Sequence, residues 1–311
     1  MLSRRNVRIK VMQVLYAMSR DNGMVYKDAL ASYRNNIQKS YELYLFSLWL
    51  LIQIAEYAKQ DAAIKEAKLL PTEEDKRFTA KLAENEWINS LLHNEDFMRQ
   101  VRLFKLSEKL DIDSIRLFYN DFAKTDEYKE FLDSQDSNSA VFQHVLLALY
   151  KHCNNNETFC DYLEDHYANW IDDKSLIVGA IKKTIKALPA ESNFLNEYRP
   201  DAETVEEFGE SLLAKVCEND QQLFELIEPT LRNWDAERVA VIDMILLKMA
   251  LCELTNFPTI PTKVTLNEFV EISKLYSTDK SKDFINGILD RLMKKLETEG
   301  RINKEGRGLV E

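Results

Sequence analysis

The stretch IDMILLKMALCEL, residues 242–254, decides the fold of this chain of 311 residues together with PTKVTLNEFVEISKLY (261–276) and DFINGILDRL (283–292). In each stretch the apolar side chains recur every three or four residues, which places them on one face of an α-helix. Pro258 and Pro261 separate the first two stretches and prevent one continuous helix. The sequence therefore predicts three helices that bury their apolar faces together.

The rest of the chain also has the pattern of helices. Its 7 glycines and 6 prolines are too few for the many chain reversals of an all-β fold. Helical spacing and polar turns predict helices over residues 4–20, 27–70, 73–92, 95–109, 112–133, 138–152, 157–170, 173–188, 203–218, 220–232, 236–255, 263–276 and 280–298. We therefore expect an all-α protein.

The main domain boundary is expected in the segment 189–203, which is less regular than its surroundings and contains Pro189 and Pro200. The pattern divides the chain into a basic first helix (1–20), a helical insertion of unknown role (21–202), a compact helical core (203–298) and a flexible tail (299–311). No repeat of fixed period is present in the sequence.

The charge of the chain is unevenly distributed. In total, 41 Lys and Arg stand against 52 Asp and Glu, which gives a formal net charge of −11. The first ten residues carry four basic side chains and no acidic one, whereas residues 201–240 carry eleven acidic and three basic ones. Residues 280–311 are again mixed, with eight basic and six acidic residues. Basic ends and an acidic stretch indicate two different partners, although solvated helix faces are the simpler alternative.

The sequence gives no sign of a membrane span or of an oxidising compartment. The apolar stretch 43–55 is too short to cross a bilayer and lies between Glu42 and Glu56, so it favours a buried helix. The basic start of the chain lacks the apolar run of a signal peptide. Four cysteines are few for a chain of this length, which favours reduced thiols. We therefore expect a cytoplasmic protein.

Residue patterns for catalysis, cofactors and metals are weak. The sequence contains no GxGxxG, no P-loop and no GxSxG. The residues of metal-ligand type that cluster are His152, Cys153, Cys160 and His166, and their spacing matches no common zinc pattern. Buried thiols and ordinary histidines explain this cluster better. We therefore expect a protein that is not an enzyme and holds neither a metal nor a cofactor.

The three stretches quoted first, in this order and at this spacing, resemble the NusB family of bacterial transcription antitermination factors. The basic start RRNVRIKVMQVLYA (4–17) and the run FGESLL (208–213) are also similar to the family. Within the three stretches the matching positions are Ile242-Asp243, Lys248, Ala250, Glu253-Leu254, Pro261, Lys263-Val264, Asn267-Glu268, Val270-Glu271, Lys274, Tyr276 and FINGILD at 284–290. The resemblance covers about residues 1–20 and 203–298.

The resemblance implies two small helical bundles and a non-catalytic role in antitermination. It further implies binding of a single-stranded, boxA-like leader or rRNA transcript together with a small-subunit ribosomal protein of the NusE type, within an RNA polymerase antitermination complex. In the family the RNA follows the basic first helix and the start of the last long helix. Carried over by position, the implied RNA-binding residues are Arg4, Arg5, Arg8, Lys10, Lys248, Lys280, Lys282, Phe284 and Asn286.

The chemistry of these residues suits RNA, but structural roles compete with it. Arginines bind phosphates, and an aromatic ring such as Phe284 can stack on an unpaired base or pack in the apolar stripe of its helix. Lys248 lies in an apolar helix and can simply extend its ammonium to the surface. No apolar face explains three arginines in the first turns, so we expect these to contact RNA. Asp283, where the family usually has a basic residue, disfavours RNA.

Two other functions compete with RNA-dependent antitermination. One is a protein-interaction scaffold with a NusB-like fold and little RNA affinity, which the net charge, Asp283 and the insertion favour. The other is an RNA-modifying enzyme, because NusB-like domains also precede methyltransferase domains. That function requires a following α/β domain with a catalytic cysteine, and none follows here before Glu311.

Overall fold

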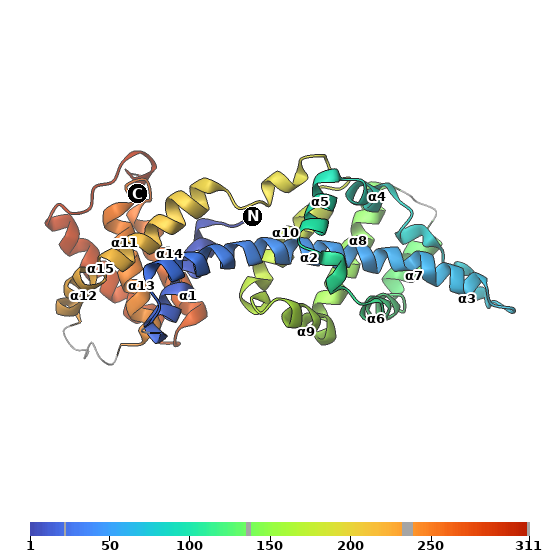
Figure 1. Cartoon of the computed structure of the whole chain (residues 1–311), viewed down its shortest axis with the longest axis horizontal. Helices are drawn as coiled ribbons and strands as arrows, with labels where there is room; N and C mark the ends of the chain where they lie inside the picture. The colour runs from blue at the N-terminus through green and yellow to red at the C-terminus, as the bar shows by residue number, and fades with distance from the viewer. Residues whose placement is uncertain (22, 135–137, 232–238, 310–311) are drawn as a thin grey trace. The chain divides into compact units, whose positions relative to one another are not determined.

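The computed structural model describes residues 1–21, 23–134, 138–231 and 239–309. Over these residues all regular secondary structure is helical and no strand occurs (Figure 1), which confirms the predicted all-α class. The chain divides into two compact units. The first unit comprises Met1 and Gln38–Arg199, and the second comprises Leu2–Ile37 and Pro200–Glu311.

The division between Arg199 and Pro200 falls inside the irregular segment 189–203. The long helix α2 (Tyr26–Glu66) contributes its first residues, up to Ile37, to the second unit and its remainder to the first. The start of the predicted insertion 21–202 therefore packs with α1 and the C-terminal helices rather than with the rest of the insertion.

Short helices and turns surround α2 in the first unit. In chain order they are α3 (Glu73–Arg77), η1 (Ala80–Leu82), α4 (Glu86–Leu92), α5 (Glu95–Leu103), η2 (Leu106–Lys109), α6 (Ile112–Phe122), α7 (Asp126–Asp133), α8 (Ser139–Asn155), α9 (Glu157–His166), α10 (Trp170–Lys186) and η3 (Phe194–Glu197).

Three of the helices that the sequence predicts in the first unit are interrupted or end early. The predicted helix 73–92 is wrong: α3 ends at Arg77, and the Asn85 side chain accepts the Ile88 amide at 2.9 Å and begins α4. The predicted helix 112–133 is interrupted in the same way at Thr125, the N-cap of α7. The predicted helix 95–109 ends early, at Leu103, before Lys105 adopts a positive φ of 51°.

The core of the first unit is built around the middle of α2. The apolar stretch 43–55 is buried there except for the half-buried Gln53, as the sequence predicts. Stacked rings pack against it and beside it, with centroids 4.6 Å apart for Tyr44 and Tyr198 and 4.5 Å apart for Trp87 and Phe142. Among the residues that the structure describes, no helix has the length and apolar content needed to cross a membrane.

The second unit is formed by α1 (Arg4–Arg20), the start of α2 and the C-terminal elements. The latter are η4 (Glu203–Glu210), α11 (Ser211–Glu218), α12 (Asp220–Ile227), η5 (Glu228–Thr230), α13 (Val241–Asn256), α14 (Thr262–Tyr276), α15 (Ser281–Thr298) and η7 (Gly306–Leu309). The predicted helix 220–232 is shorter than expected, and the first residues of the predicted helix 236–255 lie outside the described residues.

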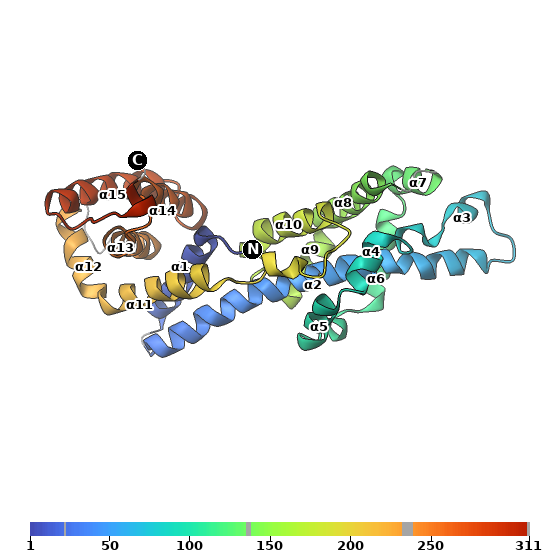
Figure 2. The ribbon, with the colours of Figure 1, turned by 90° about the horizontal axis from the view of Figure 1, so that it is seen from above.

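Helix α13 is the centre of the second unit. It packs against α1, α11, α12, α14 and α15 (Figure 2), and most of its side chains from Ile245 to Leu254 are buried on every side. A helix that is apolar all round must be covered by neighbours. The first of the three quoted stretches therefore supplies the core onto which the other two pack.

The start of α2 is held against α1 and η4 through one tight contact. The Tyr33 hydroxyl donates to the Val205 carbonyl of η4 at 2.9 Å. Gly209, also in η4, lies so close that a Cβ there would stand 1.9 Å from Tyr33 Oη and 2.6 Å from Val7 Cγ1. η4 is π-helical, a rare form, and the Tyr33 hydroxyl adds a side-chain hydrogen bond to one of its carbonyls.

The sequence predicts a flexible tail after α15. Its described residues 301–309 contact the turn that follows α13: the Glu305 amide donates to the Pro258 carbonyl at 3.0 Å, and Gly308 is buried.

We expect Gly209→Ala to lower the free energy of unfolding by about 1–3 kcal/mol, because the new methyl group has no room. Gly179→Ala is the matched control: Gly179 lies in α10 with no atom within 4 Å of its would-be Cβ. The control should raise stability by about 0.5–1 kcal/mol through helix propensity. Urea unfolding followed by circular dichroism measures both. Equal effects of the two substitutions would contradict the tight contact at Gly209.

Candidate nucleic-acid interface

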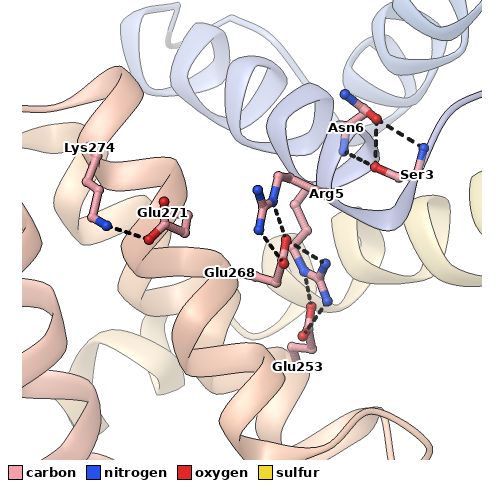
Figure 3. Close-up of polar contacts among 8 residues, drawn as sticks. Ser3, Arg5, Asn6, Glu253, Glu268, Glu271 and Lys274 are labelled. Atoms are coloured by element: carbon pink, nitrogen blue, oxygen red, sulfur yellow. Dashed lines mark hydrogen bonds and ion pairs between the residues drawn. The ribbon is translucent and has the colours of Figure 1, made fainter. Parts of the chain in front are cut away.

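Helix α1 begins at a capping box that fixes where its arginines point. The Ser3 side chain caps the Asn6 amide at 3.4 Å, and the Asn6 side chain accepts the Ser3 amide at 3.0 Å (Figure 3). The helix therefore starts at Arg4. Arg4 and Arg8 are four residues apart and share one face, whereas Arg5 points to the neighbouring one.

Arg8 is buried in the core of the second unit. Its guanidinium is 2% exposed and donates two hydrogen bonds of 2.7 Å to Glu253 of α13, which is 0% exposed. The Thr265 hydroxyl adds a third hydrogen bond to Glu253 at 2.7 Å. The Arg8 guanidinium also lies over the rings of Phe208 and Phe269, 5.1 and 5.8 Å from their centroids.

The resemblance implies that Arg8 binds RNA, but the structure buries its side chain against Glu253. Its role is structural: it joins α1 to α13, and it has no surface on which a phosphate could bind. Lys10 is also 2% exposed. Neither residue belongs to the accessible part of the candidate interface.

Arg5 lies at the surface and is held by α14. Its side chain is 46% exposed and donates to both carboxylate oxygens of Glu268, at 2.6 and 2.7 Å (Figure 3). The hydrogen bonds to Glu268 raise the pKa of Arg5 above its already high ordinary value. Glu268 also lies 3.7 Å from Arg8, so one carboxylate links the exposed arginine to the buried one.

Arg4 is half-buried, with 39% of its side chain exposed, and it is also paired. It contacts Glu203 of η4 at 3.0 Å, and its guanidinium lies over the Phe208 ring, 5.6 Å from the centroid. Exposed ion pairs of this kind contribute only about 0–1 kcal/mol, so a phosphate can replace the carboxylate at little cost. Of the α1 residues that the resemblance implies bind RNA, Arg4 and Arg5 thus remain available to an anionic ligand.

The start of α15 is positioned by Asp243 of α13. This buried carboxylate accepts hydrogen bonds from Ser277 at 2.6 Å and from Ser281 at 2.7 Å. The two serines lie on either side of the turn between α14 and α15. Asp243 therefore fixes where α15 begins, a role that the sequence did not reveal, because its signal is only one acidic residue in an apolar helix.

Exposed polar side chains follow this fixed start. Lys280, Lys282 and Asn286 are exposed, while Phe284 is half-buried on the apolar stripe of α15. Lys282 and Asn286 are four residues apart and therefore share one face of the helix. The amino-terminal end of a helix also carries a partial positive charge, which favours an anion there. Asp283 is exposed among these residues and opposes that effect.

Lys248 belongs to a different part of the second unit. Its side chain is only 14% exposed, pairs with Asp220 at 2.6 Å and lies 5.8 Å from the Phe224 ring centroid. These residues line an apolar cavity of about 440 Å³ between the end of α1 and helices α11 to α13, together with Leu15, Met18, Cys217 and Met244. The structure thus separates Lys248 from the residues at the start of α15.

The cluster of metal-ligand residue types in the first unit has ordinary partners. His152 Nε2 lies 2.9 Å from an Asp121 carboxylate oxygen, and His166 Nε2 lies 2.9 Å from the Lys109 carbonyl oxygen. Cys153 is buried, which raises the pKa of its thiol strongly. In the described part of the chain no three His, Cys, Asp or Glu side chains converge as a metal site would require.

Comparison with known proteins matches residues 180–294 to the model of the NusB family. Three similar relatives bear the name transcription antitermination protein NusB. The one from Salinibacter ruber is 41% identical over 104 residues, 33% of this chain and 65% of the relative. That from Chloroherpeton thalassium is 40% identical over 100 residues, 32% and 47% of the two chains. That from Syntrophotalea carbinolica is 44% identical over 91 residues, which are 29% of this chain and 58% of the relative.

The aligned regions thus span between about half and two thirds of the length of these relatives. The family match begins within α10 and ends within α15. It includes Glu253 and Glu268, the partners of the α1 arginines, but not α1 itself.

We expect Arg8→Ala to lower the free energy of unfolding by about 3–5 kcal/mol, because it leaves the Glu253 carboxylate buried without its cation. Arg4→Ala is the control on the same face of α1 and should cost less than about 1 kcal/mol, since its ion pair is exposed. Chemical unfolding monitored by circular dichroism tests both. Similar small losses for the two variants would contradict a buried structural role for Arg8.

Proposed function

We propose that this chain, whose residues 180–294 belong to the NusB family, is a non-catalytic transcription antitermination factor that binds single-stranded, boxA-like RNA. The observation that carries the proposal is the 40–44% identity to relatives named as transcription antitermination proteins, over the region that builds the core of the second unit. The exposed cations of α1 and α15 are the candidate RNA surface on that unit.

The proposed RNA surface follows α14 from one cationic group to the other. Arg5 is paired with Glu268 in the middle of α14, and Arg4 precedes it on α1. The end of α14 leads through a short turn to Lys280 and Lys282, and α14 packs along α15. Guanidinium and ammonium groups neutralise phosphates, and an aromatic side chain such as the half-buried Phe284 can stack on an unpaired base.

The protein-interaction scaffold remains the second candidate, because acidic partners oppose RNA at several of these positions. Glu203 and Glu268 already neutralise Arg4 and Arg5, and Arg8 and Lys10 are buried. A phosphate must therefore displace carboxylates rather than meet free cations. A scaffold would keep the same fold without saturable, salt-dependent RNA binding.

We expect Lys280→Glu/Lys282→Glu to weaken binding of a boxA-like single-stranded RNA. Loss of two phosphate contacts should lower the slope of log K against log salt by about 1.4, at about 0.7 per contact for a single strand. Filter binding or fluorescence anisotropy at several salt concentrations measures both quantities. Lys182→Glu/Lys186→Glu on α10 is the control, because it makes the same charge change at exposed positions of the first unit.

The two candidate functions differ in this experiment. The RNA-binding factor is supported if the unmodified chain binds RNA saturably and the α15 variant, but not the control variant, binds it with lower affinity. Absence of saturable binding and of any salt slope in the unmodified chain would favour the scaffold.

We further propose a small-subunit ribosomal protein of the NusE type as the protein partner. Asp220 lines the apolar cavity near Lys248 and is exposed, and helices α11 and α12 carry the further exposed acidic residues Glu218 and Glu225. An apolar recess on helices with exposed acidic residues suits a basic protein that inserts an apolar side chain. The RNA and the protein would then occupy different parts of the second unit, in agreement with the separate basic and acidic stretches of the sequence.

We expect Glu218→Lys/Glu225→Lys to slow association with such a ribosomal protein and to reduce its salt dependence, because steering by opposite charges is lost. Asp161→Lys/Glu164→Lys on α9 makes the same charge change in the first unit and is the control. Biolayer interferometry gives the association rates, and a pull-down with and without RNA tests for a ternary complex. Equal association rates for the two variants would place the partner elsewhere.

A further inference from the structure

The tail after α15 leaves the helix through a defined turn rather than by fraying. Gly300, at φ 65°, follows the last helical residues, and its amide donates to the Glu297 carbonyl at 3.0 Å. The Arg301 amide donates to the Leu296 carbonyl at 2.9 Å. These two bonds form a Schellman motif, which sets the direction of the chain that follows.

The tail is then fixed against the turn between α13 and α14. Besides the bond from Glu305 to Pro258, the Lys304 ammonium donates to the Phe257 carbonyl at 3.1 Å. Gly308 lies so close to this turn that a Cβ would stand 1.9 Å from the Pro258 carbonyl oxygen. Only glycine allows this approach of the two backbones. The path of residues 301–309 is therefore determined by contacts along its length.

The turn that holds the tail also reaches the cationic start of α1. Phe257 packs edge-on against Phe208, with ring centroids 5.3 Å apart. Phe208 in turn lies beneath the guanidinium of Arg4. Two aromatic rings thus connect the tail to Arg4, the first residue of the proposed RNA surface.

The tail presents two exposed guanidinium groups from this fixed backbone. Arg301 is 46% exposed, and its guanidinium lies 3.7 Å from the Glu299 carboxylate, which is long for an ion pair. Arg307 lies in η7 and is exposed. Lys304 does not add to this charge at the surface, because it is bound to Phe257. Among the described tail residues, Leu309 is the large apolar side chain that is exposed. One such side chain is too small an apolar area for the centre of a protein interface.

We infer that residues 301–309 extend the RNA-binding surface, with Arg301 and Arg307 contacting phosphates beyond those at Arg4 and Arg5. This inference rests on the proposed RNA-binding function. Because the tail is already ordered, its arginines bind without the entropic cost of fixing a flexible segment. In a chain with a net charge of −11, the described tail carries the exposed Arg301 and Arg307 against one exposed acidic residue, Glu305.

The test is an RNA titration of Arg301→Glu/Arg307→Glu across salt concentrations, using a single-stranded RNA that carries flanking nucleotides beside the boxA-like sequence. We expect weaker binding and a slope lowered by about 1.4, for two lost phosphate contacts. Arg301→Lys/Arg307→Lys keeps the charges and should retain most of the slope. Lys182→Glu/Lys186→Glu again controls for net charge, and circular dichroism verifies the helical fold.

Gly308→Val tests the fixed path of the tail, because it keeps both arginines but cannot keep the contact with Pro258. We expect it to weaken RNA binding as well. The inference fails, while the proposed function stands, if the unmodified chain binds RNA and both Arg301→Glu/Arg307→Glu and Gly308→Val bind it as tightly as the unmodified chain. If the unmodified chain does not bind RNA, the proposed function fails too. Loss of ribosomal-protein binding with unchanged RNA binding would assign the tail to protein contact and overturn the inference.

Discussion

The second unit depends on the buried ion pair between Arg8 and Glu253. A guanidinium and a carboxylate removed from water are stable only when both are fully paired, and here two hydrogen bonds and the Thr265 hydroxyl provide that pairing. The pair fixes the register of α1 on α13, because a shift of one residue would leave both charges buried without a partner. Once Arg8 is placed, Arg5 meets Glu268 on α14, and Arg4 lies over Phe208.

One basic segment thus performs two tasks. Its inward arginine holds the helix in the fold, and its outward arginines form pairs at the surface that are exchangeable. The difference is one of solvation: a surface carboxylate can return to water when a phosphate takes its place, whereas Glu253 cannot. The carboxylates of Glu203 and Glu268 are therefore compatible with RNA binding, although they set a cost for it.

The first unit is a large helical body with its own core, and most of it lies outside the NusB family match. Its long helix α2 nevertheless begins in the second unit, where Tyr33 and Arg34 contact Val205 and Glu210. The residues between α1 and the region that matches the family model are therefore not one separate block. The first residues of α2 help to cover α1 and η4.

Sequence alone determined the all-α class and the three C-terminal helices, because hydrophobic periodicity and proline positions are local properties of the chain. It also located the cationic groups. It could not separate Arg8 from Arg4 and Arg5, because the three have the same side chain, and only packing decides which one meets a buried carboxylate from a helix 245 residues away. The hydrogen bonds of Asp243 to Ser277 and Ser281, the pairing of Lys248 with Asp220 and the docking of the tail at Pro258 were hidden for the same reason. Each depends on a partner distant in sequence, and the tertiary structure alone brings the two together.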